Sequence, residues 1–177
     1  MKIARLEALY GRLLDAAALC GCALLFLMML AICLDVLLRN VPIIPSMRGL
    51  PASNDLTEYA LYLMTLLTAP WLLRRGQHIR VDILLRAIPR ELAWGCEWLV
   101  DVAALLCCVV VFWYSAEATL SSYRAGALTI KTLVTPEWWS LVPLPVTFAL
   151  LAVEVLFRMV RLANGPRAPR DDAVSSA

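Results

Sequence analysis

The chain has 177 residues, of which 62% are hydrophobic and only 17% are charged. Soluble domains average about 45–50% apolar and about 25% charged residues, so this composition argues against an ordinary soluble enzyme. It also argues against disorder, which requires low hydrophobicity and high charge. The net charge of +2, from 16 basic and 14 acidic residues, is too balanced for a nucleic-acid-binding protein. The length indicates a single domain.

The apolar residues are gathered into four blocks, each close to the roughly 20 residues that cross a bilayer as a helix. We predict membrane-spanning helices over residues 16–38, 56–73, 92–118 and 137–160. The alternative is a soluble bundle of buried helices, but residues 19–34 lack the polar face that such a helix would show. The predicted fold is therefore an all-α membrane protein, with one four-helix domain over residues 1–163 and a disordered cytoplasmic tail over 164–177.

The distribution of basic residues predicts the orientation. With both termini in the cytoplasm, 12 Lys and Arg residues fall on the inner side and four on the outer side, as the positive-inside rule requires. The basic start could also belong to a signal peptide. However, the first apolar run has 23 residues, whereas a cleavable signal has an apolar core of about 7–15. We therefore expect an uncleaved first helix.

The connection between the second and third blocks has a helical pattern of its own. Val81, Leu84, Leu85 and Ile88 are spaced i, i+3, i+4 and i+7, which predicts a short amphipathic helix over residues 79–87 in the cytoplasmic interface. A simple extension of the third helix is the alternative. In the fourth block, Pro143 and Pro145 predict a bend or local loosening.

The sequence offers little that points to a cofactor or to catalysis. All six cysteines lie within or beside apolar blocks and none forms a CxxC pair, so we interpret them as small hydrophobic residues. His78 is the single histidine. It cannot supply the pair that usually ligates a b-type haem, and with Asp82 it offers too few ligands for a metal. We expect no cofactor, no metal site and no enzymatic activity.

Acidic residues at membrane depth are the remaining candidates, because a charge there usually faces a partner or a cavity. Two acids have a basic residue four positions on and can neutralise themselves, in the pairs Asp35–Arg39 and Glu154–Arg158. Glu97 and Asp101 share a helix face and have the same sign. They need arginines from the inner loop, protonation or groups on another protein. Glu58 either caps its helix or has a functional role.

Residues 69–82 read Ala-Pro-Trp-Leu-Leu-Arg-Arg-Gly-Gln-His-Ile-Arg-Val-Asp. This basic, glycine-containing turn followed by His and a hydrophobic-Asp step resembles the small membrane subunit of tripartite ATP-independent periplasmic (TRAP) transporters. The resemblance covers residues 13–161. Supporting residues stand in the same order along the chain: Arg39, Glu58, Thr132, Pro136, Trp138 and Pro143.

The resemblance implies a small scaffold subunit in the bacterial inner membrane. Its partners would be a large membrane subunit, a periplasmic solute-binding protein and membrane lipids. Transport would be sodium-coupled uptake of an organic acid, with the substrate and ion sites in the large subunit. Gly76, His78 and Asp82 would hold the amphipathic helix against the membrane helices and the large subunit. Arg39 and Glu58 would contact the partner or lipid headgroups. Glu97 and Asp101 are further candidates for the subunit interface.

Two other classes of function stay open. One is a stand-alone, homo-dimeric proton- or cation-coupled transporter, with Glu58 or Asp101 as the coupling carboxylate. The other is a membrane anchor for a redox enzyme, although the single histidine counts against haem. The chain itself does not identify the transported solute, because the residues that would select it belong to the other subunits.

Overall fold

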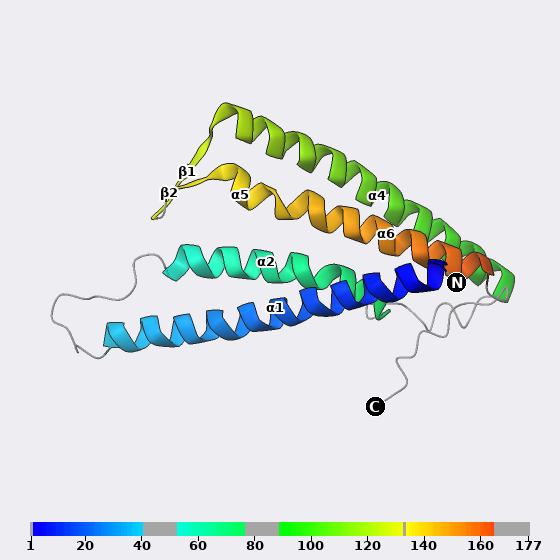
Figure 1. Ribbon diagram of the computed structural model, residues 1–177, viewed down its shortest axis with the longest axis horizontal. Helices are drawn as coiled ribbons and strands as arrows, with labels where there is room; N and C mark the ends of the chain where they lie inside the picture. Colours follow the sequence, from blue (N-terminus) through cyan, green and yellow to red (C-terminus); the bar gives the residue numbers. More distant parts are fainter. Residues whose placement is uncertain (1, 41–52, 77–88, 133, 165–177) are drawn as a thin grey trace.

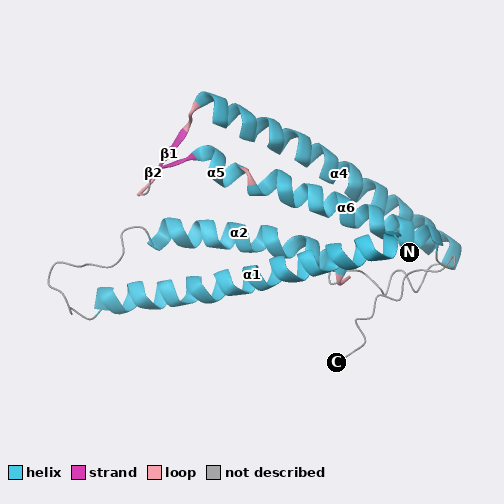
Figure 2. Ribbon diagram, viewed as in Figure 1, coloured by secondary structure: helices cyan, strands magenta, loops and turns pink. Residues whose placement is uncertain are grey.

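A computed structural model of the chain describes residues 2–40, 53–76, 89–132 and 134–164. In chain order the elements are α1 (Lys2–Asn40), α2 (Ser53–Arg74), α4 (Arg90–Ala125), β1 (Leu128–Ile130), β2 (Val134–Pro136), α5 (Glu137–Leu141) and α6 (Pro143–Asn164). Almost all of the described residues are helical, which confirms the all-α class (Figure 2). The predicted interfacial helix over 79–87 and the predicted tail lie largely outside the described residues.

The helices form two antiparallel pairs, α1 with α2 and α4 with α6, and α2 also packs against α6. Figure 1 shows that the two pairs meet near the N-terminus and diverge toward the β1–β2 hairpin. We call these two ends of the bundle the N-terminal end and the hairpin end. The hairpin is antiparallel, with Thr129 opposite Thr135.

Three helical segments are long and apolar enough to cross a membrane: Glu7–Asn40, Leu92–Ala125 and Glu137–Asn164. The α2 helix is not among them. It has Asp55 and Glu58 near its start and Arg74 at its end. Three of the four predicted spans are therefore supported by length and composition. The second span stays a prediction.

The helices extend beyond the apolar blocks that predict them. The α1 helix begins at Lys2 rather than residue 16, and α4 continues to Ala125 rather than residue 118. The early turns of α1 are helical because they also pack, with Leu14 fully buried. Gly126 ends α4 with a left-handed φ of 61°, and its N–H bonds the carbonyls of Ser122 and Tyr123.

The predicted loosening near Pro143 is confirmed, because the helical chain is divided there into α5 and α6. Pro143 and Pro145 lack the N–H groups that would continue the hydrogen bonding of α5. The division at Val142 is slight, since Val142 keeps helical dihedral angles and its N–H still bonds the carbonyl of Trp138. The two segments therefore form one nearly continuous rod.

Close packing of α1 on α2 depends on a glycine. A Cβ atom added at Gly21 would lie 2.9 Å from Cγ2 of Thr68, whereas a Cβ atom at Gly95 on α4 would meet nothing within 4 Å. We expect Gly21→Leu to destabilise the fold by about 1–3 kcal/mol through overpacking. Gly95→Leu is the matched control and should leave stability unchanged or raise it, because leucine favours helix more than glycine does. Thermal unfolding in detergent, followed by circular dichroism, measures both. Equal midpoints would contradict the assigned packing.

Candidate functional site

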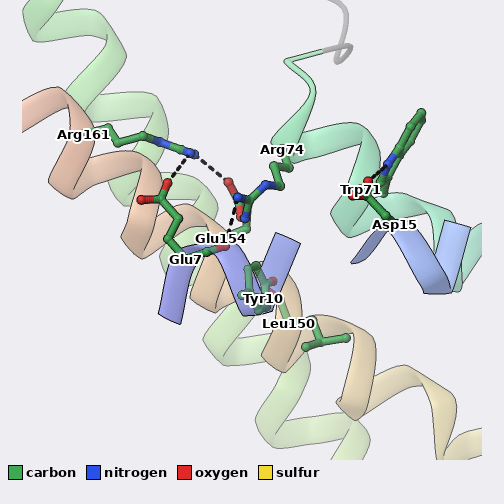
Figure 3. Close-up of polar contacts among 8 residues, drawn as sticks. All are labelled: Glu7, Tyr10, Asp15, Trp71, Arg74, Leu150, Glu154 and Arg161. Atoms are coloured by element: carbon green, nitrogen blue, oxygen red, sulfur yellow. Dashed lines mark hydrogen bonds and ion pairs between the residues drawn. The ribbon is translucent and has the colours of Figure 1, made fainter. Parts of the chain in front are cut away.

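A buried carboxylate lies at the centre of the N-terminal end. Glu154 of α6 has no exposed surface. Its Oε1 lies 2.6 Å from Nη2 of Arg161, and its Oε2 lies 3.5 Å from Nη1 of Arg74 (Figure 3). Arg74 is the last residue of α2, so the pair joins two helices. Removing a charge from water costs several kcal/mol, which the two guanidinium groups offset.

The first helix joins this cluster through Glu7. Its carboxylate lies 2.9 Å from Nη1 of Arg161, and its backbone carbonyl accepts a hydrogen bond of 3.1 Å from Nη2 of Arg74. A Cβ atom at Gly11 would lie 2.9 Å from the same Nη2, so the glycine leaves room for the guanidinium. We call Glu7, Arg74, Glu154 and Arg161 the three-helix network. Two acids and two arginines balance its charge.

Tyr10 reinforces the junction between α1 and α6. Its hydroxyl donates a 2.7 Å hydrogen bond to the carbonyl of Leu150, and its ring lies 5.6 Å from that of Phe157. The guanidinium of Arg74 lies over the Tyr10 ring at 5.8 Å, within the range of a cation–π interaction. The N-terminal end is thus held by aromatic packing as well as by ion pairs.

A second buried ion pair joins α4 to α6. Nε of Arg158 lies 3.1 Å from Oδ1 of Asp101, and the two side chains are 15% and 3% exposed. The predicted pairing of Glu154 with Arg158 is therefore wrong. Arg158 turns to Asp101 on α4, while Glu154 pairs with Arg161, seven residues further along α6, and with Arg74 on α2. Glu97 is also buried, at 4% exposed. Asp101 therefore has a partner on the last helix, which was not predicted from the sequence.

The α1–α2 pair has its own polar contact at this end. Nε1 of Trp71 donates a 2.9 Å hydrogen bond to Oδ1 of Asp15, and Nη2 of Arg75 lies 3.9 Å from the same oxygen. The guanidinium of Arg75 also stacks over the Trp71 ring at 5.0 Å. The two side chains of the ion pair are about 60% exposed, so this contact adds orientation more than stability.

At the hairpin end, Lys131 connects the hairpin to α2. Its Nζ lies 2.6 Å from Oε2 of Glu58 and 5.7 Å from the ring centre of Tyr59. The hydrogen bond from Lys131 to Glu58 raises the pKa of the ammonium group, so Lys131 stays charged at neutral pH. The hydroxyl groups of Tyr59 and Thr135 are 3.4 Å apart. These contacts, together with a 3.0 Å hydrogen bond from Ser122 to Glu137, position the hairpin.

Two residues carried over from the resemblance lie at this end. Because α2 begins at Ser53, Glu58 lies beyond its first turn and pairs with Lys131 instead of capping the helix. Arg39 lies in the last turn of α1. Its Nη2 lies 3.1 Å from Oδ2 of Asp35, as the i, i+4 spacing predicts. The Arg39 side chain is 58% exposed, so it remains accessible to a headgroup or to another protein.

The glycine of the basic turn has a definite conformational role. Gly76 follows α2 with φ at 66°, in the left-handed region that side-chain-bearing residues avoid. Its N–H bonds the carbonyl of Leu73, which satisfies one of the orphan carbonyls at the helix end. His78 and Asp82 lie outside the described residues, so their proposed roles stay predictions.

Large apolar side chains cover the outward faces of the bundle. On α1 they include Leu19, Phe26, Leu27 and Leu37, and on α4 they include Leu99, Val100, Leu106 and Trp113, all at least 56% exposed. In the apolar 18-residue stretch of α1, only 11% of the residues are buried within the chain, and in that of α4 only 17% are. Such surface is stable only in lipid or against another apolar protein.

Within the described ranges, no group of three or more His, Cys, Asp or Glu side chains is arranged to hold a metal ion. Of the acids buried at the N-terminal end, Asp101 and Glu154 contact arginines. The six cysteines are free thiols. The arrangement is suited to joining helices, because each of its ion pairs bridges separate elements or neighbouring turns.

Apolar spanning helices with their charges paired at the ends define an integral membrane protein. Residues 28–165 match the family described as tripartite ATP-independent periplasmic transporters, DctQ component. The match covers well over half of the chain, which therefore belongs to this family of TRAP transporter small components. No curated protein matches the chain. The resemblance noted in the sequence is thereby confirmed.

Proposed function

We propose that this chain is the scaffold subunit of a cation-coupled TRAP transporter in the bacterial inner membrane. It would work with a large membrane subunit and a periplasmic solute-binding protein to take up an organic acid. The observation that carries this proposal is the contrast between two kinds of surface. Buried ion pairs fasten the helices to each other, while the outward faces of α1 and α4 are apolar and uncovered.

A scaffold subunit needs helices that are held rigidly together and an outer surface that binds lipid or a partner subunit. The three-helix network and the Asp101–Arg158 pair connect all four long helices at the N-terminal end. We further propose that α2 is a fourth span, since its 22 residues extend about 33 Å at 1.5 Å per residue. The distribution of basic residues then supports an orientation with the N-terminal end in the cytoplasm and the hairpin end in the periplasm.

Reconstituted transport tests the proposal. The full chain, the large subunit and the binding protein are assembled in proteoliposomes, and uptake of labelled organic acids is followed under an inward sodium gradient. We expect uptake only when all three proteins are present. Uptake by this chain alone would favour the stand-alone transporter. Uptake by the large subunit and binding protein without this chain would contradict a required scaffold. A coloured purified chain would favour a redox anchor.

The basic turn provides a test of subunit pairing. His78→Ala and Asp82→Ala are expected to lower recovery of the large subunit several-fold in a detergent pull-down. The expected cause is loss of the contacts that hold the inner connection in place. Gln77→Ala, at the neighbouring position, is the matched control and should pair normally. Unchanged pairing and unchanged uptake in both variants would refute the assignment of these two residues.

A further inference from the structure

A groove at the hairpin end lies between α2 and the segment that leads into α6. Its deeper part has a volume of about 220 Å³ and is lined mainly by aromatic and aliphatic side chains, among them Tyr62, Leu63, Trp139 and Pro143. A wider, shallower part of about 570 Å³ adjoins it and reaches Glu58, Lys131 and Glu137. Both parts share Tyr59, Tyr62 and Ser140, so they form one continuous groove.

The groove is amphipathic along its length. An apolar cavity of about 150 Å³ stays dry and admits a ligand as large as benzene, so the deeper part has room for several methylene groups. The mouth contains an acidic and a basic side chain, Glu58 and Lys131, which are 66% and 34% exposed. A matching ligand therefore has an alkyl chain joined to a charged head.

The charged side chains at the mouth of the groove determine which headgroup the ligand can have. Lys131 supplies one cation, whereas Glu58 and Glu137 supply two carboxylates, and Asp55 also acts on Lys131 electrostatically. A headgroup with only negative charge would be repelled by this excess of carboxylates. A headgroup with both a phosphate and an ammonium group can contact Lys131 with the first and a glutamate with the second. Such charge-assisted contacts are the strong ones.

Aromatic residues place the groove at a suitable depth. Tyr123 and Trp138 lie in edge-to-face contact at 5.6 Å, and Trp138 and Trp139 at 5.9 Å. Tyrosine and tryptophan concentrate where the headgroups meet the hydrocarbon core. The mouth of the groove then lies among headgroups, and its deeper part lies toward acyl chains.

We propose that this groove binds one molecule of phosphatidylethanolamine. Its phosphate contacts Lys131, its ammonium group contacts Glu58 or Glu137, and the upper part of one acyl chain lies between Tyr62 and Trp139. Lipid binding in this groove requires only that the chain lies in a membrane. The proposal is therefore tested independently of the transport function proposed above.

Native mass spectrometry tests the site on the full chain. The protein is reconstituted in nanodiscs of equal phosphatidylethanolamine and phosphatidylglycerol, then released into mild detergent. We expect one retained lipid, with phosphatidylethanolamine favoured about tenfold, as one charge-assisted hydrogen bond provides. Retention of no lipid, or equal retention of both lipids, would overturn the proposal.

Paired substitutions on α2 locate the lipid. Leu63→Trp fills the deeper part of the groove and should reduce retention about tenfold through lost apolar contact. Leu61→Trp, at a position 45% exposed, is the matched control and should retain the lipid. Glu58→Gln should reduce the preference for phosphatidylethanolamine, while the acyl chain of the lipid is still held in the groove. Because Glu58 is exposed, this variant tests the site even if Leu63→Trp fails to fold.

Two further outcomes would overturn the proposal. One is unchanged retention in both Leu63→Trp and Glu58→Gln. The other is a complex with the large subunit in which the lipid is absent and a photo-crosslinker at position 63 captures that subunit. The groove would then be a protein contact.

Discussion

Glu154→Gln is expected to lower the free energy of unfolding by about 3 kcal/mol. The substitution keeps the shape of the side chain. It leaves Arg161 with the carboxylate of Glu7 and Arg74 with the backbone carbonyl of Glu7. Breaking a buried ion pair by removing one partner costs about 3–5 kcal/mol. The lower figure applies because the Arg161 side chain is 43% exposed and can turn to solvent.

Chemical unfolding in detergent micelles measures this effect. Glu117→Gln is the matched control, because Glu117 also lies on a long helix but is exposed, and its unfolding free energy should change by less than about 0.5 kcal/mol. Adding Arg74→Met to Glu154→Gln should recover part of the loss, since one unpaired cation is removed. If Glu154→Gln unfolds at the wild-type midpoint, the three-helix network does not hold the bundle together.

The part of the fold that follows from local sequence was predictable. Runs of apolar residues indicate the spanning helices because lipid forces each backbone to satisfy its own hydrogen bonds. The Asp35–Arg39 pair follows from its i, i+4 spacing on α1. The division near Pro143 follows from the missing proline N–H. Each of these depends on residues within one or two turns of each other.

The contacts that join the helices could not be predicted in this way. Arg74 and Glu154 are separated by 80 residues, and Tyr10 and Leu150 by 140, so only the packing of the helices brings them together. Arg158 has two acids that it could pair with, Glu154 at i−4 and Asp101 on α4. Sequence spacing indicates only the first of these. The hairpin could not be predicted, because strands of three residues, such as Leu128–Ile130, are too short to show an alternation of apolar and polar residues.

A double-mutant cycle at Asp101 and Arg158 is expected to separate a structural role from a transport role. Asp101→Leu and Arg158→Leu should each cost about 3–5 kcal/mol of stability, because each leaves an opposite charge buried. The double variant should be more stable than either single variant, since apolar residues of similar volume often replace a buried ion pair at little cost. Unfolding of all four proteins in micelles gives the coupling energy.

The same double variant decides between the two transporter hypotheses. It has no carboxylate at position 101, so a chain that uses Asp101 to couple a cation would fold and yet fail to transport. A scaffold needs only the α4–α6 junction, which leucines can also form. We therefore expect the double variant to assemble with the large subunit and to support sodium-dependent uptake near the wild-type rate. Stable assembly without uptake would show that the Asp101–Arg158 pair takes part in transport and would contradict a purely scaffolding role for this chain.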